Sequence, residues 1–120
     1  MAYQGETIKF VIKGDENINL DKLKNFAVVV YLHCNCENSN STKILYKNNT
    51  DQIKAVLDND LQPTNTYIGI LSSSDTARMI DGQYNIELLT LTDSEERSIY
   101  QQKHAFTLEC SASKNIDFPQ

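Results

Sequence analysis

The sequence predicts an all-β domain in which two layers of short strands enclose one core. Stretches of alternating apolar and polar residues recur at a spacing of roughly ten residues, and no long segment has the periodicity of an amphipathic helix. The chain of 120 residues is long enough for one such core. We expect a single domain over residues 1–112 and a C-terminal tail over residues 113–120.

The alternating and apolar stretches predict about seven to nine strands. Ile8, Phe10 and Ile12 alternate with mostly polar residues, which is typical of a strand with one buried face. The segment 26–34 is almost entirely apolar and rich in valine, so we expect a central strand covered on both faces. Further strands are expected over residues 43–47, 52–58, 66–71, 84–88 and, with one interruption, 97–110.

Two of these strands are separated by a short polar segment that favours a turn. Asn48 and Asn49 lie between residues 43–47 and 52–58, and asparagine adopts a positive φ more readily than most residues. We therefore expect these two strands to form a hairpin and to be neighbours in one sheet.

The residues around Gly82 predict how the chain crosses between the layers. Serines 72–74 and Asp75 can cap one short helical turn, and Tyr84 follows Gly82 at the start of the next strand. In immunoglobulin-like sandwiches, a tyrosine at the start of strand F donates a hydrogen bond to the backbone a few residues upstream. We therefore predict an immunoglobulin-like antiparallel β-sandwich with a short helical turn before strand F and a structural corner at Asp75, Gly82 and Tyr84. Alternatively, Tyr84 is an ordinary strand tyrosine half buried in the core.

The last strand changes its pattern partway along. Apolar residues fall on odd positions at Ile99 but on even positions from Phe106, which predicts a bulge near residues 101–104. The polar segment 100–103 interrupts the pattern, and we expect an exposed edge at which another protein adds a strand. Alternatively, this segment is an ordinary bulge kept polar, which prevents aggregation. Its residues are Tyr100, Gln101, Gln102 and Lys103.

Charge and composition restrict the class of protein. The chain has 16 acidic and 11 basic residues, a formal net charge of -5, and its basic residues form no cluster. Binding to nucleic acid or to an anionic membrane requires such a cluster, so we expect neither partner. The first residues lack the features of a signal peptide, and we expect a cytoplasmic protein with no transmembrane segment.

Cysteine and histidine residues are the candidates for metal binding. His33, Cys34 and Cys36 are close in sequence, and Cys110 and His104 complete a site only if the last strand lies beside this segment. The spacing matches no common zinc motif, and Cys34 is also explained as a small buried residue with a reduced thiol. We expect no metal and no other cofactor. A small metal-binding protein built on His33, Cys34, Cys36 and Cys110 remains an alternative.

The remaining polar and aromatic residues do not predict catalysis. Serines 72–74 fit a helix cap, and Asp93, Glu95 and Glu96 fit a solvated turn. The six tyrosines could stack on sugars, but most of them fall inside strand patterns, which favours packing roles. We expect a non-enzymatic protein, with a carbohydrate- or peptide-binding module as the alternative.

Five short motifs occur in succession along the chain: Gly5-Glu6-Thr7, Asn19-Leu20-Asp21, residues 82–88, Arg97-Ser98-Ile99 and Phe106-Thr107-Leu108. This succession resembles the N-terminal domain family of phage baseplate upper proteins and related tail-module proteins over about residues 5–110. The resemblance implies a structural component of a phage or prophage tail or baseplate, located in the virion or in the cytoplasm of the producing bacterium. It also implies protein partners, either other virion proteins or further copies of the chain in a homo-oligomer.

Overall fold

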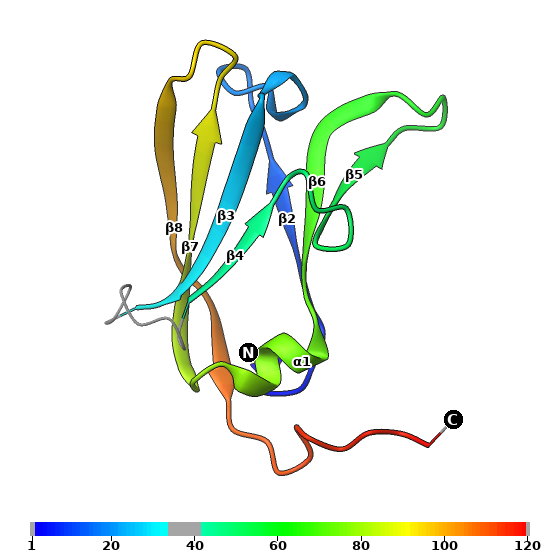
Figure 1. The fold of residues 1–120 in the computed structure, drawn as a ribbon, viewed down its shortest axis with the longest axis vertical. Coiled ribbons are helices and arrows are strands. Elements are labelled where there is room, and N and C mark those ends of the chain that lie inside the picture. Colours follow the sequence, from blue (N-terminus) through cyan, green and yellow to red (C-terminus); the bar gives the residue numbers. More distant parts are fainter. Residues whose placement is uncertain (1, 34–41, 120) are drawn as a thin grey trace.

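The computed structural model describes residues 2–33 and 42–119, and most of these residues belong to β-strands (Figure 1). The prediction of an all-β protein is confirmed. One sheet has five strands in the order β1-β8-β7-β3-β4, and the other has three strands in the order β2-β6-β5. The strands are β1 (Ala2–Tyr3), β2 (Ile8–Lys13), β3 (Asn25–Leu32), β4 (Thr42–Tyr46), β5 (Ile53–Leu57), β6 (Pro63–Leu71), β7 (Gly82–Leu91) and β8 (Arg97–Glu109). The helical elements are the 3₁₀-helix η1 (Leu20–Lys22) and the α-helix α1 (Ser73–Arg78).

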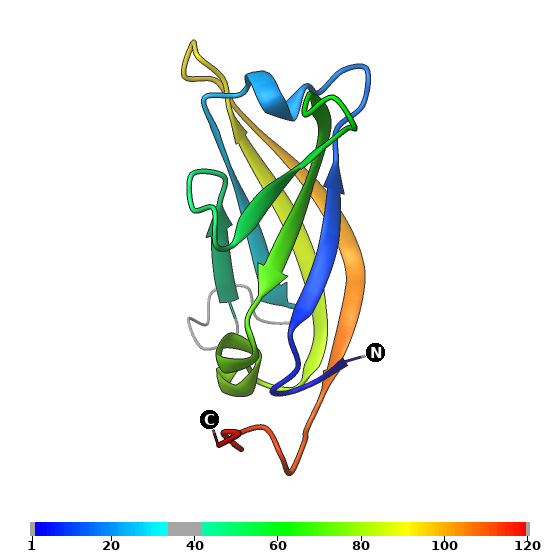
Figure 2. The ribbon, with the colours of Figure 1, turned by 90° about the vertical axis from the view of Figure 1, so that its right-hand side faces the viewer.

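The two sheets face each other and enclose one apolar core (Figure 2). Phe26 and Val28 of β3 enter this core from the five-stranded sheet, and Tyr67 of β6 enters it from the other sheet. The rings of Phe26 and Tyr67 meet edge to face with centroids 5.1 Å apart. Because β3 lies between β7 and β4, the prediction of a central strand in segment 26–34 is confirmed for the residues that the structure describes.

The predicted hairpin between residues 43–47 and 52–58 is wrong. β4 pairs with β3, whereas β5 pairs with β6 in the other sheet. Leu45 and Ile53 are both buried in the core, but they enter it from opposite sheets. The asparagine turn therefore carries the chain from one layer to the other. Alternation indicates that a strand has a buried face, but it does not indicate which strand is its neighbour.

The predicted helical turn is present as α1. The Ser72 hydroxyl accepts a hydrogen bond from the N–H of Asp75 at 3.1 Å, and the Asp75 carboxylate accepts one from the N–H of Ser72, which makes a capping box. The buried Thr76 hydroxyl donates to the carbonyl of Glu6 at 2.7 Å. This bond ties α1 to the start of the chain at the lower end of the sandwich (Figure 1). Within residues 2–33 and 42–119, no helix is long and apolar enough to cross a membrane.

Lys47 follows β4 and holds η1 against the core. Its ammonium group donates hydrogen bonds to the carbonyl oxygens of Leu20 and Leu23, both at 3.0 Å. The same nitrogen lies 5.9 Å from the ring centroids of Phe26 and Tyr67, within the range of a cation–π interaction. Lys47 therefore connects the turn before β3 to aromatic side chains of both sheets.

Asn65 and Tyr67 of β6 fix the same turn from the other sheet. Asn65 has a φ of 56°, and its side chain accepts from the N–H of Leu20 at 2.6 Å and donates to the carbonyl of Ile18 at 2.9 Å. The Tyr67 hydroxyl donates to Asp21 at 2.8 Å. Burial, and then the hydrogen bond to Asp21, raise the pKa of Tyr67 to about 12.

Candidate functional site

The predicted corner is built around Tyr84 in β7. Its side chain is fully buried, and its hydroxyl donates a hydrogen bond to the carbonyl of Ile80, four residues upstream, at 2.5 Å. Its ring stacks on the ring of Phe106 in β8 with centroids 5.3 Å apart. Burial, and then the charge of Asp81, raise the pKa of Tyr84 to about 12. The hydrogen bond that the corner hypothesis requires is therefore present, and it fixes the connection between α1 and β7.

Gly82 and Asp75 support this connection in different ways. Gly82 has a φ of 143°, which residues with a side chain rarely adopt, and a Cβ there would stand 2.8 Å from Leu32. Asp75 binds Ser72 in the helix cap and pairs with Lys43 Nζ at 3.2 Å. Burial raises the pKa of the Asp75 carboxyl, but hydrogen bonds from Lys43 and Ser72 outweigh it, so the net pKa lies below its ordinary value. Asp75 therefore anchors α1 to β4.

The predicted edge segment lies in β8, at the margin of the five-stranded sheet. Tyr100, Gln101 and Gln102 are exposed and pair with β7 on one side. On its other side β8 pairs with β1, at Leu108 and the following residue, so among the described residues no strand pairs beside the edge segment. Of Lys103, the structure describes only its place in β8. Addition of a partner strand here stays a prediction.

A bulge follows this segment and is held by Asn85. The register between β7 and β8 shifts around Asn85, and His104 on the opposite strand has a φ of 56°, so the bulge predicted near residues 101–104 is present. Asn85 is buried, and its Oδ1 accepts a hydrogen bond from the N–H of His104 at 2.8 Å. Its Nδ2 consequently faces Nδ1 of His33 at 3.2 Å. Because an amide nitrogen only donates, Nδ1 of His33 accepts, and the proton of the neutral ring is on Nε2.

Two of the candidate metal ligands lie close together. The ring centroids of His33 and His104 are 4.8 Å apart. Cys34 and Cys36 lie outside the described residues, and Cys110 is an exposed free thiol just after β8. In the described part of the chain, no three His, Cys, Asp or Glu side chains form a group that could hold a metal ion. The described residues therefore provide a histidine pair rather than a metal centre.

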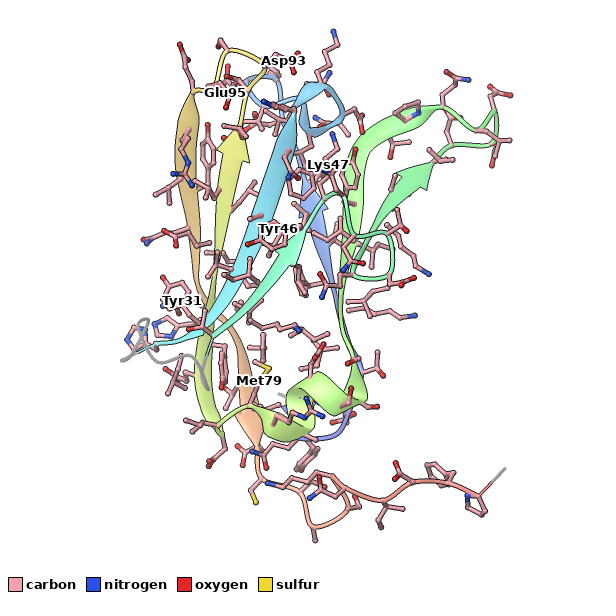
Figure 3. The ribbon with its side chains drawn as sticks, in the orientation of Figure 1. Tyr31, Tyr46, Lys47, Met79, Asp93 and Glu95 are labelled. Carbon is pink, nitrogen blue, oxygen red and sulfur yellow. The ribbon has the colours of Figure 1, made fainter. Side chains whose placement is uncertain are left out.

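The acidic residues of the β7–β8 turn and the tyrosines occupy surface and packing positions. Glu95 pairs with Lys24 across the surface, and Asp93 lies in the same turn (Figure 3). Three tyrosines are buried: Tyr31, Tyr67 and Tyr84. The other three are about half exposed and belong to three different strands: Tyr3 on β1, Tyr46 on β4 and Tyr100 on β8.

The surface of the five-stranded sheet that points away from the core is largely apolar. Its residues alternate with the core residues along β3, β4, β7 and β8, and the cross-strand pairs arrange them in four rows. We call these residues the outer face; Tyr31 and Tyr46 belong to it (Figure 3). The central row is Tyr46, Ala27, Leu89 and Ile99. On one side of the central row lies the row of Asn25, Leu91 and Arg97. On its other side lies the row of Ile44, Val29, Glu87 and Gln101, and beyond that lies the fourth row, of Thr42, Tyr31 and Asn85.

Several apolar side chains of the outer face remain accessible to solvent. Ile99 is 60% exposed, Tyr46 is 48% exposed and Ile44 is 41% exposed. Ala27 is small and leaves a hollow of about 120 Å³ between its neighbours, which include Tyr46 and Leu89. Sites for drug-sized ligands usually enclose roughly 300 Å³ or more, so this hollow has room for a single side chain rather than for such a ligand.

The outer face was not identified from the sequence. The available signal was the composition of segment 26–34, which has apolar residues at both parities and was interpreted as a strand covered on both faces. In the described part of the chain, the second sheet covers only the inner face. The apolar residues of the other parity, Ala27, Val29 and Tyr31, therefore belong to the outer face.

Comparisons with known proteins give the chain no family. No family model, no curated protein and no solved structure matches it.

Proposed function

We propose that the chain is a non-enzymatic assembly module with an immunoglobulin-like fold, which acts through protein contacts in a phage or prophage tail or baseplate. The strand order supports the immunoglobulin-like assignment. With β2 taken as strand B, one sheet contains strands B, E and D, and the other contains C, F and G with an additional C′ strand at β4. Tyr84 then lies near the start of strand F, where this fold carries its corner tyrosine.

The exposed apolar outer face is the observation that supports a role in protein–protein contacts. Contiguous apolar surface on a soluble protein usually marks a site of interaction, because its exposure to water is unfavourable. Ile44, Tyr46 and Ile99 contribute such surface from the two margins of the four rows. An open sheet surface with these residues is suited to another protein rather than to a small substrate.

Polar side chains that could have indicated chemistry have structural partners instead. Ser72 and Asp75 cap α1, and Asn85 holds the bulge at His104 and orients His33. These contacts support a role in assembly over a role in catalysis.

The virion location is proposed from the resemblance of the short motifs. Residues 82–88 form the start of β7, and both Arg97-Ser98-Ile99 and Phe106-Thr107-Leu108 belong to β8. These motifs thus lie in β7 and β8, the two strands that make the corner and two of the four strands that form the outer face. This placement supports a structural use of these residues over a use in binding a cofactor.

Mass spectrometry of phage particles from the bacterium that encodes the chain tests the proposal. We expect peptides of the chain at a fixed ratio to a tail protein in gradient-purified particles, and labelling of the tail by gold-conjugated antibody. A cytoplasmic host protein, which should be lost during purification, is the control. Recovery of the chain in the soluble fraction only would contradict the virion assignment.

A further inference from the structure

We propose that the outer face binds a second copy of the same chain and forms a symmetric dimer. This inference rests on the proposed assembly function and names the partner of the outer face. Three observations select a second copy: the charges on the face, the arrangement of those charges about its central row, and the position of the hollow.

The outer face is electrically neutral although the chain is acidic. Its four rows contain one acidic residue, Glu87, and one basic residue, Arg97, whereas the whole chain has a net charge of -5. The ion pairs of the described residues are Lys24–Glu95 and Lys43–Asp75, so Glu87 and Arg97 are not paired with each other or with another charge there. Two acidic chains repel each other least where they meet through a neutral surface.

Glu87 and Arg97 lie on opposite sides of the central row. Arg97 is in the row of Leu91, and Glu87 is in the row of Val29, with Leu89 and Ile99 between them. In a twofold dimer each contact occurs twice, because the same surface is used by both copies. A twofold axis along the central row places Arg97 of each copy near Glu87 of the other, with Ile99 at the axis.

The same axis also brings an exposed apolar side chain beside the hollow. The hollow lies beside Ala27, between the central row and the row of Leu91. Ile44 lies on the other side of the central row and is 41% exposed. Rotation about the axis brings Ile44 of the second copy to the row of Leu91 at the β4 margin, beside Tyr46 and Asn25, which both line the hollow.

The size of the outer face predicts a weak dimer. Four strands spaced by about 4.8 Å and four rows spaced by about 6.8 Å make a face of roughly 20 by 27 Å. A stable interface usually buries about 800 Å² of each partner, and this face is smaller, at roughly 500 Å². The dimer should therefore form at high local concentration, as inside an assembled particle.

Sedimentation velocity at low ionic strength, over a wide range of concentration, tests the dimer through charge reversal. The wild-type chain should dimerise as the concentration rises. E87R has two basic residues on the face and R97E has two acidic ones, so each variant alone should dimerise at least about tenfold more weakly. An equimolar mixture of E87R and R97E restores both opposite-charge pairs and should form a heterodimer.

V11R is the matched control, because Val11 is 66% exposed and belongs to β2 in the other sheet. V11R should dimerise as the wild type does, and circular dichroism should show that every variant is folded. A wild-type chain that stays monomeric at the highest concentration would overturn the dimer, as would single variants that dimerise normally or a mixture that does not restore association. None of these results affects detection of the chain in purified particles, so failure of this inference is distinguishable from failure of the proposed function.

Discussion

The hydroxyl of Tyr84 donates a hydrogen bond to the carbonyl oxygen of Ile80 at 2.5 Å, and the tyrosine side chain is fully buried. The ring fills the core against Phe106, and the hydroxyl satisfies a carbonyl at the connection from α1 to β7. These two contributions can be separated, because phenylalanine preserves the ring and removes only the hydroxyl.

We expect Y84F to reduce the free energy of unfolding by about 1–3 kcal/mol, because the partner carbonyl loses its hydrogen bond. Y84A should cost about 3–5 kcal/mol, since it also leaves a cavity. Equilibrium urea unfolding measures both values. Y3F is the control, because Tyr3 is 48% exposed. A Y84F variant as stable as the wild type would show that the ring alone makes the corner.

The raised pKa values of Tyr67 and Tyr84 predict loss of stability at alkaline pH. Both values are raised from 10.0 to about 12, so the folded state favours the protonated phenol. This contribution is fully present below pH 10.0 and is lost as the pH rises towards about 12. Urea unfolding at a series of pH values should show a decline in this window that is smaller in Y67F/Y84F. An equal decline in both proteins would contradict the role of these two hydroxyls.

Asn85 should determine the stability of the bulge. N85A removes the acceptor for the N–H of His104, so we expect a loss of about 1–3 kcal/mol in the free energy of unfolding. The amide of His104 should also exchange its hydrogen faster. Q101A, at an exposed position of β8, is the control and should change neither quantity. Unchanged exchange at His104 in N85A would mean that another group satisfies this amide.

Lys47 should stabilise η1 through its ammonium group. K47M keeps an unbranched apolar side chain but removes the hydrogen bonds to the carbonyls of Leu20 and Leu23, so we expect a loss of about 1–3 kcal/mol. K54M is the matched control, because Lys54 is an exposed lysine of β5. Thermal unfolding compares the two variants. Equal melting temperatures for K47M and K54M would refute this role.

The sequence alone predicts a structural feature correctly where that feature depends on a local pattern of residues. Alternation at residues 8–12, the serine cap before α1 and the change of parity before Phe106 each correspond to an element of the structure. These features are set by residues close together in the chain. The position of Tyr84 after Gly82 predicts the hydrogen bond of the corner for the same reason, since its partner Ile80 is only four residues away.

Features that depend on distant residues were not predictable from one sequence. Lys47 acts on carbonyls more than 20 residues upstream, and Asn65 acts on Leu20 across 45 residues. The partner of segment 43–47 was predicted wrongly because a polar turn permits either a hairpin or a crossing between sheets. The outer face needs side chains from four strands, so its apolar character became visible only with the cross-strand register.

We propose that the chain contacts protein through its outer face. The most direct measurement is a series of ¹H–¹⁵N correlation spectra of the wild-type chain recorded from dilute to concentrated solution. We predict that amide shifts at Val29, Leu89 and Ile99 change with concentration while those around Val11 stay constant. Shifts that never change, or that change on β2 and β5 instead, would show that the outer face does not bind a second copy.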